Sequence, residues 1–349
     1  MTSWQKLIKN SISHHDQLSR FPGIDQKEIA EVCRIYPMRV NPYYMELIQQ
    51  SGDPLWRQAI PDIRELLDQT GLDDPLDEEN LSPVPNLVHK YPDRVLFLVS
   101  SQCSMYCRFC TRKRKVGRKE MVIDDKTIAA GLAYIQKNKE IREVLLSGGD
   151  PLMLTDVQLE KILQAVRRIN TVEVIRIGTR IPCTLPMRVT RKLASMLKKY
   201  HPLYINTHFN HPAEITPEST LACSRLADAG IPLACQTVLL KGVNDDKLII
   251  QELMCKLLQI RVKPYYLFQA DLTRGADHFR TPVETGLEIM RYLIGRISGM
   301  AVPTYALDAP GGGGKIPLTP DYISSLDENS LEFLTYQGTP CSYPNSRHE

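Results

Sequence analysis

The chain has 349 residues, enough for one large domain or two modest ones. Hydrophobic residues make up 43% and charged residues 24%, and the net charge of +3 excludes a polybasic nucleic-acid protein and a polyacidic tail protein. No apolar run approaches the roughly 18 residues of a membrane helix, and the amino terminus lacks the layout of a signal peptide. We therefore expect a cytoplasmic protein that has no membrane partner.

The first part of the chain, residues 1–88, is predicted to be a helical segment. Residues 26–36 and 62–67 carry the apolar spacing of helices, and proline-rich turns follow at 74–75 and 83–85. The pattern changes after these turns, so we place the start of the main domain at residue 89.

From Arg94 onward, short apolar runs alternate with amphipathic stretches. The predicted strands are 94–100, 144–147, 172–177, 203–206, 232–239 and 262–268. The predicted helices are 125–137, 155–169, 190–199, 217–229, 246–258 and 283–297. Six strand–helix units indicate an α/β fold with a parallel sheet, either an open doubly wound sheet or an incomplete barrel. In either fold the active site lies at the carboxyl ends of the strands.

Three of the nine cysteines are clustered directly after the first of these strands, at Cys103, Cys107 and Cys110. An odd and scattered set of cysteines argues against a disulfide framework, whereas three thiolates in one loop can converge on a soft metal centre. Structural zinc usually takes four ligands from paired clusters, and the sequence has no second cluster. Three cysteines can instead hold three irons of a four-iron cluster and leave the fourth open, which the spacing and the location favour.

A second motif, Ser147-Gly148-Gly149-Asp150-Pro151, follows the next predicted strand. Glycines let a backbone approach a ligand closely, and a carboxylate there can accept hydrogen bonds from ribose hydroxyls or from an amine. An ordinary turn at the end of a strand is the alternative.

A third motif, Asp308-Ala-Pro-Gly-Gly-Gly-Gly-Lys315, places a lysine directly after four glycines. It departs from the phosphate-loop pattern because Ile316 follows the lysine. A desolvated lysine loses its proton and attacks aldehydes, which is a second interpretation, and a surface turn is a third. The residues alone leave these three alternatives open.

The C-x3-C-x2-C spacing resembles that of the radical S-adenosylmethionine superfamily. This resemblance implies a partial (β/α)6 barrel and a [4Fe-4S] cluster on Cys103, Cys107 and Cys110. It also implies that S-adenosylmethionine binds the open iron and yields a 5′-deoxyadenosyl radical. The segment Gly148, Gly149 and Asp150 matches the superfamily's site for the amino group of S-adenosylmethionine.

Four segments together resemble the lysine 2,3-aminomutase family, over about residues 53–317. They are the cysteine loop with Thr111–Arg114, the 308–315 motif, Tyr91–Arg94 and Asn206–His211. The resemblance implies that Lys315 is catalytic and carries pyridoxal 5′-phosphate. The implied reaction is a radical 1,2-amino migration that converts L-lysine into β-lysine. We accordingly expect a helical segment at 1–88, a barrel at 89–300 and a carboxyl-terminal segment with the cofactor lysine at 301–349.

The resemblance also implies roles for single residues. Arg112 matches the arginine that holds the substrate carboxylate, and its guanidinium fork suits that role. Asp271 and Asp308 match two acids that hold the distal ammonium, and the glutamate-specific relatives replace these acids. Helix capping by Asp271 and a turn role for Asp308 are the alternatives. His208 and Gln236 match positions near S-adenosylmethionine, and Arg94 is expected to hold the cofactor phosphate.

Other functions compete with this interpretation. A shorter branch of the family acts on a lysine side chain of translation elongation factor P, and arginine or glutamate are further substrates. The stretch 108–119 holds seven Lys or Arg, but only Phe109 is aromatic, so we expect it to flank anionic ligands and not nucleic acid. A non-catalytic iron–sulfur module would have no use for Lys315, Arg112 and the two acids.

The resemblance implies partners as well. A flavodoxin or ferredoxin is the expected electron donor. Longer family members carry a zinc site that helps to pair subunits. Here only Cys341 lies beyond Lys315, and Asp246 stands near the position of a further zinc ligand. We therefore expect this zinc site to be absent, and any homo-oligomer to form through other surfaces.

Overall fold

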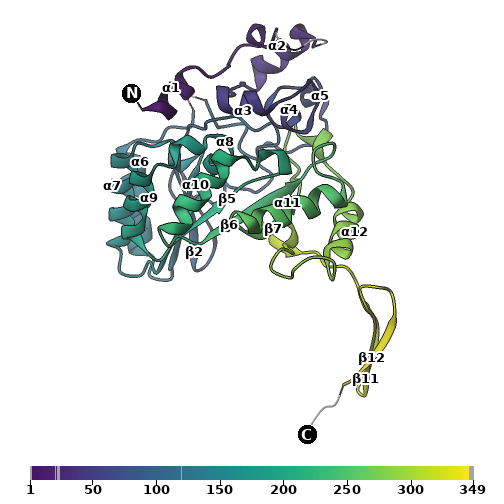
Figure 1. The fold of residues 1–349 in the computed structure, drawn as a ribbon. Coiled ribbons are helices and arrows are strands. Elements are labelled where there is room, and N and C mark those ends of the chain that lie inside the picture. The colour runs from purple at the N-terminus through teal and green to yellow at the C-terminus, as the bar shows by residue number, and fades with distance from the viewer. Residues whose placement is uncertain (1, 20, 22–23, 119, 346–349) are drawn as a thin grey trace.

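The computed structural model describes residues 2–19, 21, 24–118 and 120–345. Its main element is a nine-stranded sheet in which the strands follow one another in chain order (Figure 1). Strands β2 to β8 run parallel, whereas β1 and β9 pair antiparallel at the two edges. The strands are β1 (Leu87–Tyr91), β2 (Arg94–Ser100), β3 (Glu143–Gly148), β4 (Val174–Gly178), β5 (Leu203–Thr207), β6 (Leu233–Leu239), β7 (Lys263–Gln269), β8 (Thr304–Ala309) and β9 (Gly314–Pro317).

Helices connect the parallel strands and cover the outer face of the sheet (Figure 1). They are α6 (Asp125–Lys137), α7 (Asp156–Arg167), α9 (Arg191–Leu197), α10 (Pro217–Asp228), α11 (Lys247–Gln259) and α12 (Val283–Leu293). Several begin at a side chain that accepts a hydrogen bond from the first turn, as Thr155 does for α7 and Asp246 for α11. Their apolar faces pack on the strands, where Val144, Ile175 and Leu203 are fully buried.

These elements confirm the predicted partial (β/α)6 barrel. The six predicted strands are β2 to β7, and each is followed by a helix. The structure adds a seventh parallel strand, β8, and two antiparallel edge strands that the periodicity did not predict. Within the described ranges, no helix is both long enough and apolar enough to cross a bilayer.

The amino-terminal part forms short helices that lie over one end of the barrel (Figure 1). They are α1 (Ser3–Lys9), α2 (Gln26–Ile35), α3 (Pro42–Leu47), α4 (Pro54–Ala59) and α5 (Arg64–Leu67). The backbone of the cysteine loop is tied to this layer: Tyr106 N–H donates to the Arg39 carbonyl at 2.9 Å, and Arg108 N–H to the Gln58 carbonyl at 2.9 Å. The helices thus cover the end of the barrel at which the cysteine loop lies.

The carboxyl-terminal part contributes to two separate sheets. Strands β8 and β9 complete the nine-stranded sheet. The strands β10 (Ile323–Leu326), β11 (Ser330–Leu334) and β12 (Pro340–Pro344) form an antiparallel sheet of their own, which extends away from the barrel (Figure 1).

Candidate active site

Two cavities open at the carboxyl ends of the parallel strands. The first, of about 280 Å³, is lined by the cysteine loop and by residues that follow β3, β4 and β5; we call it the cluster cavity. The second, of about 340 Å³, is lined by residues of β1, β2, β4, β7, β8 and β9 and contains Lys315; we call it the Lys315 cavity. Their shared lining residues include Arg112, Asn206, Gln236 and Asp271. A reactant in one cavity can therefore lie next to a reactant in the other.

The structure places every residue that the sequence singled out on the lining of these cavities. The cluster cavity contains Cys103, Cys107, Cys110, Arg112, Gly148, Gly149, Asp150, His208, Gln236 and Asp271. The Lys315 cavity contains Arg94, Arg112, Gln236, Asp271, Asp308 and Lys315. Their individual roles are proposals that follow from this placement.

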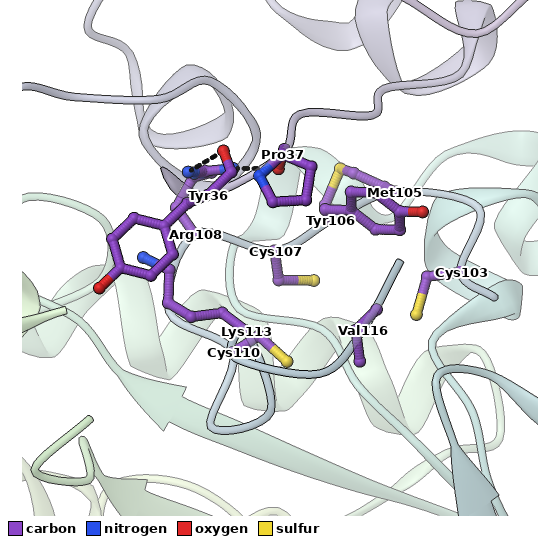
Figure 2. Close-up of a pocket in the computed structure, with 10 residues that line it drawn as sticks. All are labelled: Tyr36, Pro37, Cys103, Met105, Tyr106, Cys107, Arg108, Cys110, Lys113 and Val116. Carbon is purple, nitrogen blue, oxygen red and sulfur yellow. Dashed lines mark hydrogen bonds between the residues drawn. The ribbon is translucent and has the colours of Figure 1, made fainter. Parts of the chain in front are cut away.

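The three loop cysteines also line a small pocket beneath Tyr36 and Arg108, and Figure 2 shows their sulfur atoms on the border of one space. In the described ranges, no three His, Cys, Asp or Glu side chains are placed to hold one metal ion. A four-iron cluster takes each thiolate on a different iron, so it needs three sulfurs around a space and not at a single point. Burial raises the pKa of Cys103 and Cys110, so a bound metal centre is what would keep them as thiolates. The donor set thus fits a cluster better than a single ion.

A buried ion cluster holds the cysteine loop in place. Glu65 of α5 accepts from Arg108 Nε at 2.8 Å and from Lys113 Nζ at 2.8 Å. Arg108 lies between Cys107 and Cys110, and Lys113 follows Cys110 by three residues. Glu65 is 2% exposed. Burial alone would raise the pKa of Glu65, but Arg108 and Lys113 hold it below its usual value. We call these three residues the loop clamp.

The glycine turn after β3 packs directly on the start of the cysteine loop. Gly148 has φ +132°, and a Cβ at Gly149 would lie 2.5 Å from the Gln102 carbonyl oxygen. Only glycines allow two backbones to come this close, so their first role is to join the turn to the loop. Asp150, which follows, accepts hydrogen bonds from Thr179 Oγ1 at 2.7 Å and from the Arg180 amide at 2.8 Å. Burial raises its pKa to about 6.

His208, which directly follows β5, and Gln236 of β6 line the cluster cavity. His208 Nε2 lies 2.9 Å from Asn210 Oδ1. Burial and the charge of Arg180 lower the pKa of His208 to about 3, so the imidazole is neutral. Thr207 Oγ1 is buried in the same wall and has no hydrogen-bond partner within the described residues. An unpartnered buried hydroxyl in a cavity wall is a place for a ligand's polar group.

Lys315 lies on β9, opposite Asp308 of β8 in the antiparallel register. Its Nζ donates to the two carboxylate oxygens of Asp308 at 3.2 and 3.0 Å and lies over the ring of Phe268. Gly311, Gly312 and Gly313 lie in the turn between the two strands and Gly314 begins β9, with φ +66° at Gly311 and +94° at Gly314. The glycine run is therefore a tight hairpin turn that points Lys315 into its cavity, and this structure removes the phosphate-loop alternative.

Charged residues of opposite sign share the Lys315 cavity. Arg112 donates to both carboxylate oxygens of Glu78, from Nε at 2.9 Å and from Nη2 at 2.5 Å. Lys90 Nζ lies 3.8 Å from Asp308 Oδ1. Burial and the nearby charge of Asp308 raise the pKa of Asp271 to about 7, although Lys315 and Lys90 counteract this rise. Asp271 is thus a carboxyl group that lacks a sufficient positive partner.

Arg94, expected near a cofactor phosphate, lies at the edge of the Lys315 cavity. Its guanidinium lies 3.9 Å from the centre of the Tyr91 ring and its Nη1 bonds Asp93 at 2.7 Å. Arg176 of β4 lines the same cavity, and its buried Nε has no partner within the described residues. Arg176 Nη2 also donates to Glu143 Oε1, so both guanidiniums already pair with a carboxylate, and the buried Nε of Arg176 is the donor that an anionic group would take.

Sequence reasoning missed four charged residues of these cavities: Glu78, Lys90, Arg176 and Arg180. Arg176 carried a signal, because it is a lone charge between Ile175 and Ile177 in a barrel strand. The other three have no local pattern, since their partners are distant in sequence.

Comparison with known proteins agrees with this architecture. The radical SAM superfamily model matches residues 97–251, and the model described as lysine-2,3-aminomutase matches residues 290–349. The chain is 49% identical over 349 residues to an L-lysine 2,3-aminomutase of Methanococcus maripaludis, covering 97% of this chain and 80% of that protein. It is 46% identical over 346 residues to an L-lysine 2,3-aminomutase of Clostridium subterminale, with 97% and 83% covered.

A protein with a different named substrate is almost as similar. A glutamate 2,3-aminomutase of Clostridioides difficile is 45% identical over 340 residues, covering 96% of this chain and 80% of that protein. Overall identity therefore establishes the family but not the substrate within it. The cysteine loop, the barrel and these matches together show that the chain belongs to the lysine 2,3-aminomutase family of radical S-adenosylmethionine enzymes.

Proposed function

We propose that this enzyme is an L-lysine 2,3-aminomutase, which moves the α-amino group of L-lysine to the β-carbon and yields β-lysine. The single observation that carries this choice is the pair of acids in the Lys315 cavity. Burial and the charge of Asp308 raise the pKa of Asp271 to about 7 even though Lys315 and Lys90 lower it, so ionised Asp271 would be stabilised by a further cation. A distal ammonium between them would supply that cation.

The same pair argues against an acidic substrate. The side-chain carboxylate of glutamate would add a third negative group next to Asp271 and Asp308, at a position where burial already disfavours the ionised form. Arginine carries a distal cation as well, but its planar guanidinium is larger than an ammonium. The charge pattern therefore favours lysine first and arginine second.

The cofactors of the family divide between the two cavities. Cys103, Cys107 and Cys110 would hold the [4Fe-4S] cluster, and the Gly148–Asp150 turn, His208 and Gln236 would hold S-adenosylmethionine beside it. Lys315 would carry pyridoxal 5′-phosphate, with Arg94 near its phosphate. When bound, these groups supply the radical and the carbon–nitrogen chemistry that protein side chains lack.

The protein's own residues position the substrate. Arg112 keeps its Nη1 available while Glu78 holds the other edge of the guanidinium, so it can bind the substrate carboxylate. Asp308 accepts from Lys315 in this structure, and with the Lys315 amine engaged by the cofactor the carboxylate would be free to bind the distal ammonium. Because Arg112 and Asp271 line both cavities, a substrate held by them would lie between the two proposed cofactor sites.

The test is anaerobic turnover of the reconstituted enzyme. L-Lysine, L-arginine, L-glutamate and translation elongation factor P are offered separately with S-adenosylmethionine, pyridoxal 5′-phosphate and a reductant, and products are identified by mass and NMR. We expect β-lysine from free lysine. Modification of elongation factor P alone would move the substrate to a protein, and turnover of glutamate would refute the two-acid argument.

The acids can be tested directly in the same assay. Asp308→Asn should raise the KM for lysine about 10- to 100-fold, because a charge-assisted hydrogen bond is worth roughly 1.5–3 kcal/mol. The matched control is Asp321→Asn, on the segment between the two sheets. Among the described residues, Asp321 Oδ1 accepts only from the Ile323 amide, so the KM of Asp321→Asn for lysine should not change.

We also propose two protein partners for this enzyme. A one-electron donor of the flavodoxin or ferredoxin class would reduce the cluster, and a second copy of the chain would form a homo-oligomer. Reduction of the reconstituted enzyme by each donor, followed by EPR, tests the first. Sedimentation velocity tests the second.

A further inference from the structure

Arg180 is a largely buried cation in the wall of the cluster cavity. Neither the sequence motifs nor the family resemblance assigned a role to it. It follows β4, and its side chain is 10% exposed. Its Nη1 lies 2.8 Å from Cys107 Sγ, and its Nη2 donates to Gln58 Oε1 at 2.6 Å and to Glu214 Oε1 at 2.8 Å. One edge of the guanidinium is thus directed at a cysteine sulfur.

The groups around Arg180 fix it in this orientation. Glu214, in the short helix η5 (Pro212–Glu214), is fully buried and also accepts from Tyr44 Oη at 2.8 Å and from the Asn210 amide at 2.6 Å. Gln58 comes from α4 of the amino-terminal layer and is fully buried as well. The guanidinium also lies over the Phe109 ring, at 5.2 Å from its centre.

Arg180 makes a contact that charge pairing with Glu214 does not require, because its Nη1 is directed at Cys107 Sγ. A buried arginine paired with one carboxylate is balanced, and its remaining N–H groups usually turn to carbonyl oxygens, as those of the buried Arg188 do with Leu152 and Leu154. Arg180 instead directs Nη1 to a sulfur. A thiolate sulfur that ligates iron keeps lone pairs, so it can accept this hydrogen bond at the same time.

We propose that Arg180 is a positioning residue that donates a hydrogen bond to the Cys107 sulfur and thereby makes the cluster easier to reduce. The inference rests on the proposed cluster site. Reduction adds one electron from a low-potential donor protein and breaks no bond. Each added electron makes the cluster more negative, so a fixed positive donor at one sulfur stabilises the reduced form and raises the midpoint potential.

The test measures the midpoint potential itself by EPR-monitored redox titration without S-adenosylmethionine. Arg180→Lys keeps the charge that Glu214 needs, but a single ammonium cannot reach Glu214, Gln58 and Cys107 together. The double variant Arg180→Gln with Glu214→Gln removes both buried charges, so no unpaired carboxylate remains. Both variants lose the hydrogen bond to Cys107, so both should shift the midpoint to more negative potential.

Arg188→Lys is the control, because Arg188 is also a largely buried arginine paired with a carboxylate and its partners lie away from the cysteines. It should lower the melting temperature and leave the midpoint unchanged. The midpoint does not depend on occupancy, so a variant that binds less iron still gives a result.

An unchanged midpoint in both Arg180 variants would overturn the proposal. So would an unchanged midpoint with weakened S-adenosylmethionine binding, which would assign Arg180 to the cosubstrate. If the wild type assembles no four-iron cluster, the proposed cluster site itself fails, and that result is visible before any variant is made.

Discussion

Two carboxylates set the charge of the proposed substrate site. Burial and the charge of Asp308 raise the pKa of Asp271 to about 7, whereas an ordinary aspartate titrates near 4. Below pH 7 Asp271 is therefore neutral and above it ionised. Only the ionised form attracts an ammonium, so lysine binding should be linked to this proton.

This linkage predicts a pH profile. The kcat/KM for lysine should fall as the pH is lowered through about 7. In Asp308→Asn the like charge is gone, so the pKa of Asp271 decreases and the acid limb moves to lower pH, although turnover is weaker. Initial rates across the pH range for both proteins measure the shift. An acid limb at the same pH in both would show that another group controls it.

Lys315 and Lys90 line one cavity and both pair with Asp308, so they provide a matched comparison. We expect Lys315→Ala to lose the covalent pyridoxyl adduct that borohydride leaves on the wild type, measured by intact mass. Lys90→Ala should keep the adduct, because the hairpin between β8 and β9 still presents Lys315. An adduct of equal yield in Lys315→Ala would refute the assignment of the cofactor lysine.

The site residues that could be predicted from the sequence are those that belong to short motifs. Cys103, Asp150 and Lys315 are each found within a few positions of a strand end or a glycine run, so local spacing is enough. Glu78 and Arg180 could not be predicted in this way, because the partner that places each of them in the site is far away in sequence. The Arg112–Glu78 pair spans 34 positions and the Arg180–Cys107 contact spans 73.

Among the elements, the cysteine loop depends most on its neighbours. It is neither a helix nor a strand, so it has no regular backbone hydrogen bonds to hold it. The side-chain bonds of the loop clamp hold it instead. Glu65 of α5 is the shared carboxylate for Arg108 and Lys113. Removing a charge from such a buried pair leaves the partner uncompensated, which costs about 3–5 kcal/mol.

We therefore predict that Glu65→Gln destabilises the protein by about 3–5 kcal/mol and lowers the iron content after reconstitution. Chemical denaturation and iron analysis measure the two effects. Asp228→Asn is the control, because the Asp228–Arg261 pair is exposed and worth at most about 1 kcal/mol. Equal stability of Glu65→Gln and the control would mean that the clamp does not hold the loop.

Strand prediction succeeded where both faces of a strand are covered. Strands β2 to β7 are apolar runs between helices, and their periodicity is clear. Strand β8 was missed because Thr304–Ala309 ends in polar and small residues, and β9 because its four residues follow a glycine run. Strands of this kind are defined by their pairing with neighbouring strands, which a local pattern does not contain.

For the molecule as a whole, the amino-terminal layer and the barrel form one unit around the cavities. Glu65 and Gln58 of that layer contact Arg108 and Arg180, so the covering helices belong to the site and not only to the exterior. The sheet of β10, β11 and β12 has a different character. It shares no strand pairing with the barrel sheet, and it contains no buried residue.

This contrast predicts uneven hydrogen exchange. Backbone amides of β10 to β12 should exchange much faster than those of β3 to β6, because opening the small sheet exposes almost no apolar surface. Ile323, Leu326 and Tyr343 are already 53%, 63% and 64% exposed. Hydrogen exchange followed by mass spectrometry at two protein concentrations measures this. Strong protection of residues 323–344 that grows with concentration would contradict the prediction, since it would mean that a second copy covers the sheet.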